Sequence, residues 1–208
     1  MTDLIVCRLQ DSVYTTKDVV ELIISSFSQW KEMGIYSSLL KLTPESFSEK
    51  TVNDVVLIAI DKTNNTLCGT TSFTVLQDKQ GHKYAYNKYS AVSNLSKQNG
   101  IGSKLIEYEK QLAFNDNCCY IISDTSTLAK WSKRWHLKNG FKVIGLKSFS
   151  NNDYYSYIFR LQLQKSFLWS SELFCNLMFC ISSIKTRLMY DKFGNYTCVG
   201  RFIVKVIK

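Results

Sequence analysis

A short turn containing two glycines is the first place in this sequence where residue types and spacing could support chemistry. The segment Lys97-Gln98-Asn99-Gly100-Ile101-Gly102 follows a strand pattern and opens a helical pattern. The first amides of a helix lack partners and sit at the positive end of its dipole, so such a turn can bind phosphate. Glycine at both positions would let a diphosphate approach the main chain, and Lys97 and Lys104 would add positive charge.

On its own, this pattern also suits a plain tight turn, because G-x-G sequences are common. Two other phosphate-binding loops are excluded. A dinucleotide fingerprint requires glycine where Leu105 stands, and a P-loop requires glycine followed by lysine and a hydroxyl residue, whereas here the order is Gly102-Ser103-Lys104.

The elements that would position this turn can be predicted from hydrophobic period and capping residues. Period-2 and apolar runs predict strands over residues 3–9, 55–60, 67–76, 83–92, 118–123, 141–149 and 154–163, and helical spacing predicts helices over 15–33, from 43 onward, 103–114 and 128–138. The order is β-α-α-β-β-β-α-β-α-β-β. One helix separates strands 83–92 and 118–123, so we expect that pair to be parallel.

Two patches in this order resemble the Gcn5-related N-acetyltransferase family. Its first signature is a strand ending in valine, a bulged segment and then [QR]-x-x-G-x-[GA]; Val92 and residues 97–102 fit it, with Lys97 in place of Gln or Arg. The second is [FL]-Y-x-x-x-G-F at a helix end; residues 135–141 fit it, with His136 in place of tyrosine. The resemblance covers about residues 3–163.

The resemblance implies an α/β fold with a mixed, mostly antiparallel sheet and helices on both faces, and a co-substrate, acetyl-CoA, bound where two strands splay apart. Val92 and the main chain after it would pair with the pantetheine arm, and an amide near Val92 would stabilise the oxyanion. The residues implied in cofactor binding are Val92, Ser93, Lys97, Gln98, Asn99, Gly100, Ile101, Gly102, Ser103 and Lys104.

His136 is the best single candidate for proton transfer, because the resemblance places it beside the departing sulfur. Histidine can donate or accept a proton near neutral pH. It could therefore protonate the thiolate or take the amine's proton through water. The alternative is a capping or packing histidine beside Trp135.

A carboxylate base is less evident, because residues 84–92 contain no acidic side chain. Asp124, at the end of the next strand, is the nearest by topology, although a helix cap is the role we would favour for it. Alternation would put Asn87 and Tyr89 on one face of their strand with Ala85 and Ala91. Asn87 and Tyr89, with Asp124, are our candidates for binding the acceptor.

Charge divides the chain into two parts. The net charge is +9 over 208 residues, and residues 165–208 hold seven Lys or Arg but only Glu172 and Asp191. We therefore predict an acetyltransferase-like domain at 1–164 and a basic amphipathic extension at 165–208, with a helix over about 171–188. This helix could contact a membrane surface; packing on the domain or on a second subunit is the interpretation we favour.

The seven cysteines form no C-x-x-C pair and have no accompanying histidine cluster, so we expect no metal site and a reducing compartment. Met1-Thr2-Asp3 lacks the basic start of a signal peptide, and no apolar run is long enough to span a membrane, so a cytoplasmic location is expected.

Three functions remain to be weighed. The leading hypothesis is direct acetyl transfer from acetyl-CoA to a small-molecule amine, an amino sugar or a peptide amine. The second is a catalytically weak acyl-CoA-binding module of the same fold. A nucleic-acid binder is disfavoured, because the aromatic residues are spread along core-like elements rather than interleaved with Lys and Arg.

Overall fold

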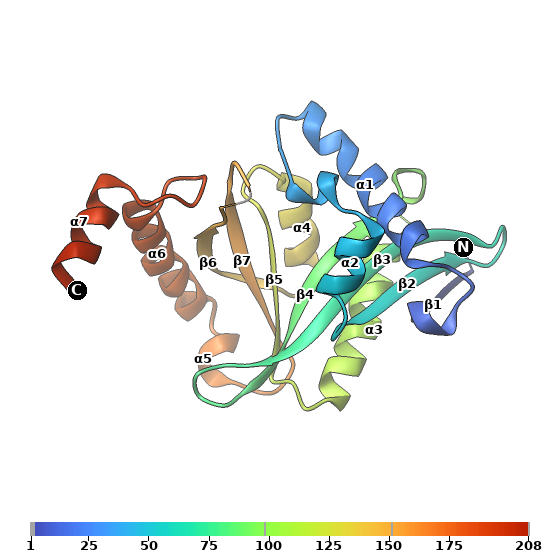
Figure 1. The fold of residues 1–208 in the computed structure, drawn as a ribbon. Helices are drawn as coiled ribbons and strands as arrows, with labels where there is room; N and C mark the ends of the chain where they lie inside the picture. The colour runs from blue at the N-terminus through green and yellow to red at the C-terminus, as the bar shows by residue number, and fades with distance from the viewer. Residues whose placement is uncertain (1–2, 98, 151, 208) are drawn as a thin grey trace.

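In the residues that the computed structural model describes, 3–97, 99–150 and 152–207, seven strands form one sheet in the order β1-β2-β3-β4-β5-β7-β6 (Figure 1). Their bounds are β1 Leu4–Arg8, β2 Val55–Asp61, β3 Thr66–Gln77, β4 Lys83–Val92, β5 Tyr120–Ser126, β6 Lys142–Ser148 and β7 Tyr155–Gln162. β4 and β5 pair in parallel, and the other neighbours pair antiparallel. The predicted mixed, mostly antiparallel sheet is confirmed.

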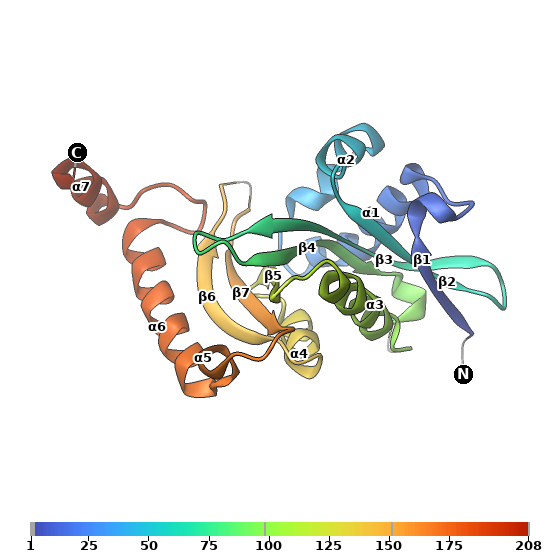
Figure 2. The same cartoon turned by 90° about the horizontal axis from the view of Figure 1, so that it is seen from below.

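Helices cover both faces of this sheet (Figures 1 and 2). On one face, α1 (Thr16–Glu32) and α2 (Pro44–Lys50) pack on β2 to β4. On the other, α3 (Ile101–Asn115) and α4 (Lys130–Lys138) pack on the opposite side of the same strands and on β5 to β7. Single 3-10 turns lie at η1 Leu9–Asp11, η2 Ser38–Lys41 and η3 Asn94–Ser96.

The helix starts follow local sequence chemistry. Thr15 and Thr43 each begin a capping box, in which the threonine side chain accepts from an amide three residues on and that residue's side chain accepts in return. Pro44 stands at the first position of α2, where its missing N–H is not needed. Two element boundaries differ from those predicted from the sequence. β5 begins at Tyr120 rather than at residue 118, and α3 begins at Ile101 rather than at Ser103.

A β-bulge in β4 changes which residues share a face. The register against β3 shifts between Thr70 and Ser72, and Tyr89 adopts a φ of 54°, an uncommon value for a side chain of this size. Ala85 packs on the α3 side, whereas Tyr89 and Ala91 pack on the α1 side. The expectation that Ala85, Asn87, Tyr89 and Ala91 share one face is therefore wrong, because the extra residue inverts the alternation.

The parallel pairing between β4 and β5 is short. It joins only Tyr84 to Tyr86 with Tyr120 to Ile122, although β4 continues to Val92 and β5 continues along β7 to Ser126. Past Tyr86 the two strands part. This separation creates the space in which the functional site is found.

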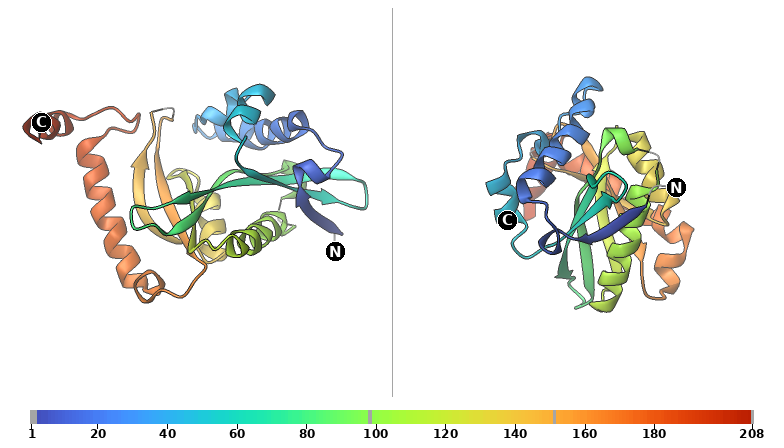
Figure 3. Two further views of the ribbon diagram at one scale, coloured as in Figure 1. Left: turned by 60° about the horizontal axis from the view of Figure 1, so that its bottom comes forward. Right: turned by 90° about the vertical axis from the view of Figure 1, so that its right-hand side faces the viewer.

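The last 40 or so residues attach to the far edge of the sheet. They form α5 (Phe167–Ser170), α6 (Glu172–Met189) and α7 (Cys198–Ile207), and α6 lies along the edge strand β6 (Figure 3). Ser182 Oγ accepts from the amide of Leu146 at 3.0 Å, and Thr186 Oγ1 donates to its carbonyl at 2.7 Å. A methyl group at Gly145 would lie 2.8 Å from Ser182 Oγ, so glycine permits this close approach.

Helix α6 thereby covers the β6 edge of the sheet. An uncovered edge strand presents unpaired backbone groups that can pair with another chain. Of the helices in the described ranges, none has an apolar stretch long enough to cross a membrane.

Candidate active site

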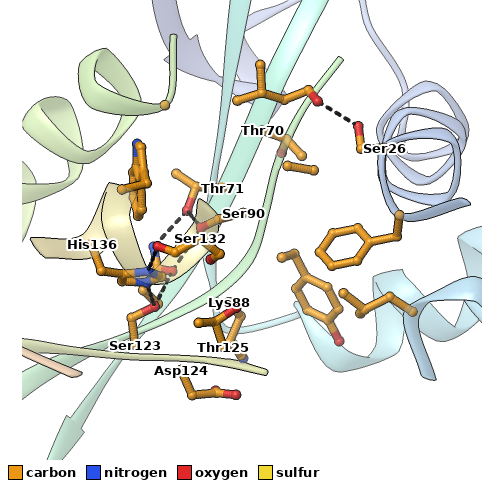
Figure 4. Close-up of a pocket in the computed structure, with 18 of the residues that line it drawn as sticks. Ser26, Thr70, Thr71, Lys88, Ser90, Ser123, Asp124, Thr125, Ser132 and His136 are labelled. Atoms are coloured by element: carbon orange, nitrogen blue, oxygen red, sulfur yellow. Dashed lines mark hydrogen bonds between the residues drawn. The ribbon is translucent and has the colours of Figure 1, made fainter. Parts of the chain in front are cut away.

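A cavity of about 640 Å³ opens where β4 and β5 part. It is lined from both sides of the sheet: by α1 and η2 on one side, and by the start of α3 and the inner face of α4 on the other. Figure 4 shows the two sides, with Ser26 facing the cavity from α1 and His136 from α4. The volume lies within the range usual for small-molecule and cofactor sites.

One end of this cavity is the start of α3. Gly100 is its N-cap, with a φ of 75° and no side-chain hydrogen bond capping the helix. A methyl group at Gly100 would meet nothing within 4 Å, so the space beside this helix start is open. Lys97 borders the cavity, and its Nζ donates to Gln29 Oε1 at 3.0 Å. An uncapped helix start beside a cation suits a diphosphate.

The second glycine has a different role from the one expected. A methyl group at Gly102 would lie 2.9 Å from the indole Nε1 of Trp135. Gly102 therefore allows α4 to pack against the start of α3, and this contact defines the wall of the cavity.

Most residues predicted from the sequence come together here. The cavity lining includes Asn87, Tyr89, Val92, Lys97, Gly100, Ile101, Gly102, Ser103, Asp124 and His136. Ser93, Asn99 and Lys104 are described but do not line it, and Gln98 lies outside the described residues. Lys138, one turn beyond Trp135, adds a cation that the sequence patterns did not single out.

Asp124 is not a helix cap. It lies within β5, while the N-cap of α4 is Ala129, so the favoured capping role is wrong. Its Oδ1 accepts a hydrogen bond from Tyr86 Oη at 2.9 Å. Burial raises the pKa of the Asp124 carboxyl, and hydrogen bonds from Tyr86 and Ser156 partly oppose this. Burial, and then the charge of Asp124, raise the pKa of Tyr86 far above neutral, so Tyr86 remains a donor.

Asp124 is the only carboxylate among the described residues that line the cavity. The nearby Lys88 also lines it, but its Nζ is paired with the buried carboxylate of Asp54 at 2.8 Å. The charge of Lys88 is thus already balanced, and Asp124 is left to attract a cation.

His136 is held as a neutral imidazole. Only 4% of the residue is exposed, and its ring stacks on Phe159 with centroids 4.2 Å apart. Its Nδ1 lies 2.8 Å from the carbonyl of Ser132, which can only accept, so Nδ1 carries the hydrogen. Nε2 is then an acceptor facing Ser123 Oγ at 3.0 Å. Burial lowers the pKa of His136 to about 4.

A buried acid that no sequence pattern had indicated lies behind the cavity. Glu109 of α3 is completely buried, and its Oε2 accepts from Asn87 Nδ2 at 2.6 Å. The Oδ1 atom of Asn87 accepts from Ser90 Oγ at 2.8 Å and lies 3.2 Å from Ser123 Oγ, whose single hydrogen is donated to His136 Nε2. A continuous polar chain therefore runs from Glu109 through Asn87 and Ser123 to His136.

One signal in the sequence could have revealed that Glu109 is buried. Glu109 lies four residues after Leu105 and eight after Ile101, on the apolar stripe of a predicted helix. A charged residue in such a stripe must be paired or neutral. Burial raises the pKa of Glu109 to about 8, against the hydrogen bonds from Asn87 and Thr71, so the carboxyl is mostly protonated at neutral pH.

Around a gap in the mixed sheet, this cavity brings together an uncapped helix start, one carboxylate among its described lining residues, and a neutral histidine. The model of the Acetyltransferase (GNAT) family matches residues 18–141, which is more than half of the chain. The chain therefore belongs to the GNAT acetyltransferase family.

Solved structures have the same fold. The NatC complex bound to Gag peptide and CoA matches with a TM-score of 0.61 at 15% identity, over 77% of this chain and 99% of that one. A GNAT acetyltransferase from Staphylococcus aureus Mu50 gives 0.59 at 15% identity, and PaiA N-acetyltransferase from Thermoplasma acidophilum with coenzyme A gives 0.58 at 15%, both with the same coverage. No curated protein matches the sequence significantly.

The buried Glu109 leads to a prediction about pH and stability. Its folded-state pKa of about 8 lies above the ordinary value of 4.5, so the folded state binds more protons between these values. The free energy of unfolding should therefore fall as pH rises through this window, by at most about 1.4 kcal/mol per pH unit from this group.

Glu109→Gln should remove that contribution while keeping the acceptor for Asn87. Urea unfolding of both proteins at pH 5.5 and 7.5 would measure it: the wild type should lose about 2 kcal/mol relative to the variant. A difference between the two proteins that does not change with pH would show that Glu109 is ionised in the fold.

Proposed function

We propose that this protein transfers an acetyl group from acetyl-CoA to an amine, directly, with both substrates bound together. The observation that carries the proposal is the single cavity that joins an uncapped helix start at Gly100 to a lone carboxylate at Asp124. Family membership supports acetyl transfer as the reaction class. The PaiA and NatC structures contain coenzyme A, which supports the choice of donor.

The residues present suit this donor. The first-turn amides of α3, with Lys97 and Lys138 nearby, would hold the diphosphate, and the main chain at Val92 would bind the pantetheine arm. The carbonyl of Val92 already accepts from Ser26 Oγ at 3.0 Å, which fixes the end of β4 against α1. When bound, acetyl-CoA supplies the acetyl group as an activated thioester.

Asp124 is the base that we propose for the acceptor amine. An amine arrives largely as an ammonium ion, which a carboxylate attracts and can then deprotonate. The raised pKa of Asp124 brings its basicity closer to neutral, where a general base is most effective. Tyr86 donates to Oδ1 and so orients the carboxylate.

For His136 we propose a role through Ser123. Because Nδ1 is committed to Ser132 and Nε2 has no hydrogen, the neutral ring can take a proton but has none to give toward the cavity. The geometry thus supports acceptance, through the Ser123 hydroxyl, of the second proton that the amine nitrogen loses after it attacks the thioester carbon, while coenzyme A leaves as the thiolate.

Aromatic side chains border the acceptor end of the cavity. Trp30 of α1 meets Trp131 of α4 edge to face, with centroids 5.6 Å apart, so the two sheet faces are joined across the gap. The other apolar residues of the lining at this end are Phe27, Leu39 and Phe149. We propose that the acceptor carries its amine on an apolar or aromatic body.

The competing hypothesis, a binding module without turnover, rests on two absences: a carboxylate in strand 83–92, and the tyrosine that His136 replaces. Asp124 supplies a carboxylate from the neighbouring strand, so an enzyme is the better-supported proposal.

Binding of the donor can be tested at Gly100. Acetyl-CoA at about 100 times its Kd should raise the thermal midpoint by roughly 5 to 10 °C. Gly100→Ala should weaken acetyl-CoA binding by about tenfold or more, because it strains the turn and places a methyl group where the diphosphate would lie.

Gly34→Ala is a matched control, because Gly34 has a similar φ of 71° with equally open space but lies outside the cavity. It should cost stability and leave affinity unchanged. If saturating acetyl-CoA does not stabilise the wild type, both hypotheses, the enzyme and the acyl-CoA-binding module, are wrong.

The role of Asp124 can be tested with Asp124→Asn. Turnover should fall by about 10²- to 10⁴-fold, with acetyl-CoA affinity retained, since general-base catalysis contributes on this scale. In the wild type, kcat/KM should rise with pH through the raised pKa of Asp124, because only the ionised form accepts a proton, and this limb should disappear in the variant.

Asp78→Asn provides the comparison: Asp78 also accepts a tyrosine hydroxyl, from Tyr120 at 2.9 Å, but lies outside the cavity. If both variants lose activity equally, Asp124 is only structural.

The proposed Ser123–His136 pair predicts non-additive losses. His136→Phe should reduce kcat by about 10²-fold with little change in acetyl-CoA affinity. Ser123→Ala should cost about as much, and the double variant should be no worse than either, because residues acting as one unit are not additive. His82→Gln, at the other histidine, is the control. Full turnover in His136→Phe would show that His136 has only a packing role.

A further inference from the structure

A chain of two hydroxyl groups connects the buried acid Glu109 with the cavity. Thr71 Oγ1 lies 3.3 Å from Glu109 Oε2 and 2.8 Å from Ser90 Oγ. Glu109 is completely buried and Thr71 is 2% exposed, whereas Ser90 is exposed and lines the cavity beside Thr71 (Figure 4). These hydroxyls bypass the amide of Asn87, which has separate donor and acceptor atoms, whereas a hydroxyl donates and accepts through one oxygen.

The hydrogen of the protonated Glu109 carboxyl has one acceptor among the described residues. Oε1 is buried without a hydrogen-bond partner, and Oε2 accepts from Asn87 Nδ2 at 2.6 Å. A hydrogen on Oε1 would be a buried donor with no acceptor, whereas a hydrogen on Oε2 can be donated to Thr71 Oγ1. Because an unsatisfied buried donor costs free energy, the protonated acid donates toward Thr71.

The hydroxyls beyond Glu109 then donate in the direction of the cavity. Thr71 Oγ1 accepts from Glu109 and from Asn87 Nδ2 at 2.8 Å, so its own hydrogen goes to Ser90 Oγ. Ser90 donates to Asn87 Oδ1 at 2.8 Å, and rotation of this hydroxyl turns its hydrogen into the cavity. Each oxygen from Glu109 to Ser90 therefore donates to the next, as proton transfer along a chain requires.

Ser90 opens into the middle section of the cavity. Along β4, Tyr86 holds the carboxylate of Asp124 at the acceptor end, and Val92 lies at the other end, where the pantetheine arm would bind. If the diphosphate is held at Gly100 and the amine at Asp124, the thioester must lie between them. The hydroxyl of Ser90 lies on β4 within this interval.

We propose that Glu109 protonates the departing thiolate of coenzyme A through Thr71 and Ser90, an inference that rests on the proposed acetyl transfer. As the bond between sulfur and the acetyl carbon breaks, the sulfur takes the hydrogen of Ser90. Ser90 takes that of Thr71, and Thr71 takes that of Glu109. Before the transfer, His136 has no hydrogen facing the cavity and Asp124 is ionised, so Glu109 supplies a proton that neither of them holds.

The same chain can restore the acid. When Glu109 is a carboxylate, Thr71 donates to it, Ser90 donates to Thr71, and Ser90 accepts from the cavity. A proton from water can then return to Glu109 after coenzyme A leaves. Over one cycle Asp124 and His136 gain the two protons that nitrogen loses, and Glu109 gives one to sulfur, so one proton is released to solvent.

The pKa of Glu109 is suited to this transfer. Burial raises it to about 8, close to the ordinary value of a cysteine thiol, about 8.5. Hydrogen bonds from Asn87 of β4 and Thr71 of β3 oppose burial, and no charge on the described residues of the strands packed against α3 shifts this pKa. His136, which is joined to Glu109 through Asn87 and Ser123, is neutral.

Glu109→Gln tests the relay, because glutamine keeps an oxygen for Asn87 but has no acidic proton. Thiol release from acetyl-CoA would be followed against pH with a panel of amines, beginning with 2-phenylethylamine. In the wild type, kcat should fall as pH rises through about 8, where Glu109 ionises. In the variant, kcat at pH 7 should be about tenfold lower or more, this alkaline limb should be absent, and acetyl-CoA affinity should be unchanged.

Substitution of the middle hydroxyl separates a relay from a structural role. Thr71→Val should lower kcat about as much as Glu109→Gln, and the double variant should be no slower, because the residues act as one unit. Thr71→Ser keeps the hydroxyl and should restore turnover. Thr51→Val is the matched control: Thr51 is also buried, and its Oγ1 donates to the carbonyl of Phe47 at 2.8 Å, outside the cavity. It should lower stability and leave kcat unchanged.

Infrared difference spectroscopy gives a measurement that does not depend on turnover. Between pH 7 and 9 the wild type should lose the band of a protonated carboxyl, and Glu109→Gln should lack this change. A wild type without the change has an ionised Glu109, which would overturn the relay.

The relay alone is also overturned if Glu109→Gln keeps the wild-type kcat and alkaline limb, or if Thr71→Ser is as slow as Thr71→Val. If the wild type releases no thiol with any amine of the panel, the proposed acetyl transfer is wrong, and the relay is wrong with it.

Discussion

The early end of the pairing between β4 and β5 is the constraint on which the rest of the site depends. A parallel pair normally continues as far as both strands run, yet here it covers only Tyr84 to Tyr86 of β4. Beyond it, β4 continues along β3 through the bulge at Tyr89, while β5 stays with β7. The main-chain groups released by this separation, and the side chains of both strands, then face one cavity.

Side chains must hold β4 and β5 apart, because unpaired backbone groups and apolar walls would otherwise come together and close the gap. Asn87 provides that support from within β4: its Nδ2 donates to Glu109 and Thr71 on one side, and on the other its Oδ1 accepts from Ser90 and lies 3.2 Å from Ser123 Oγ. Trp30 of α1 and Trp131 of α4 also meet across this gap. These buried hydrogen bonds restrict the geometry of the gap, although Glu109 Oε1 has no hydrogen-bond partner among the described residues.

The fold was predictable because its signals are local: capping residues at Thr15 and Thr43, apolar periods, and one helix between β4 and β5. The glycine turn was predictable for a similar reason, since φ above zero at Gly100 is a backbone requirement visible in residue type. The partnership of Tyr86 with Asp124, and of Glu109 with Asn87, was not. These pairs depend on β5 lying beside β4 and on helix α3 packing on β4, and neither alternation nor motif spacing encodes a contact between residues 22 or 38 positions apart.

Burial determines which ionisable groups of the site carry a charge. Glu109 is largely protonated and His136 is neutral, since burial acts against the charged form of each. Lys88 is neutralised by Asp54. The field inside the cavity is therefore set at one end by Asp124 and at the other by Lys97, Lys138 and the start of α3. Such a polarised cavity would draw a cationic amine to one end and an anionic carrier to the other, which orients the two reactants toward each other before any proton moves.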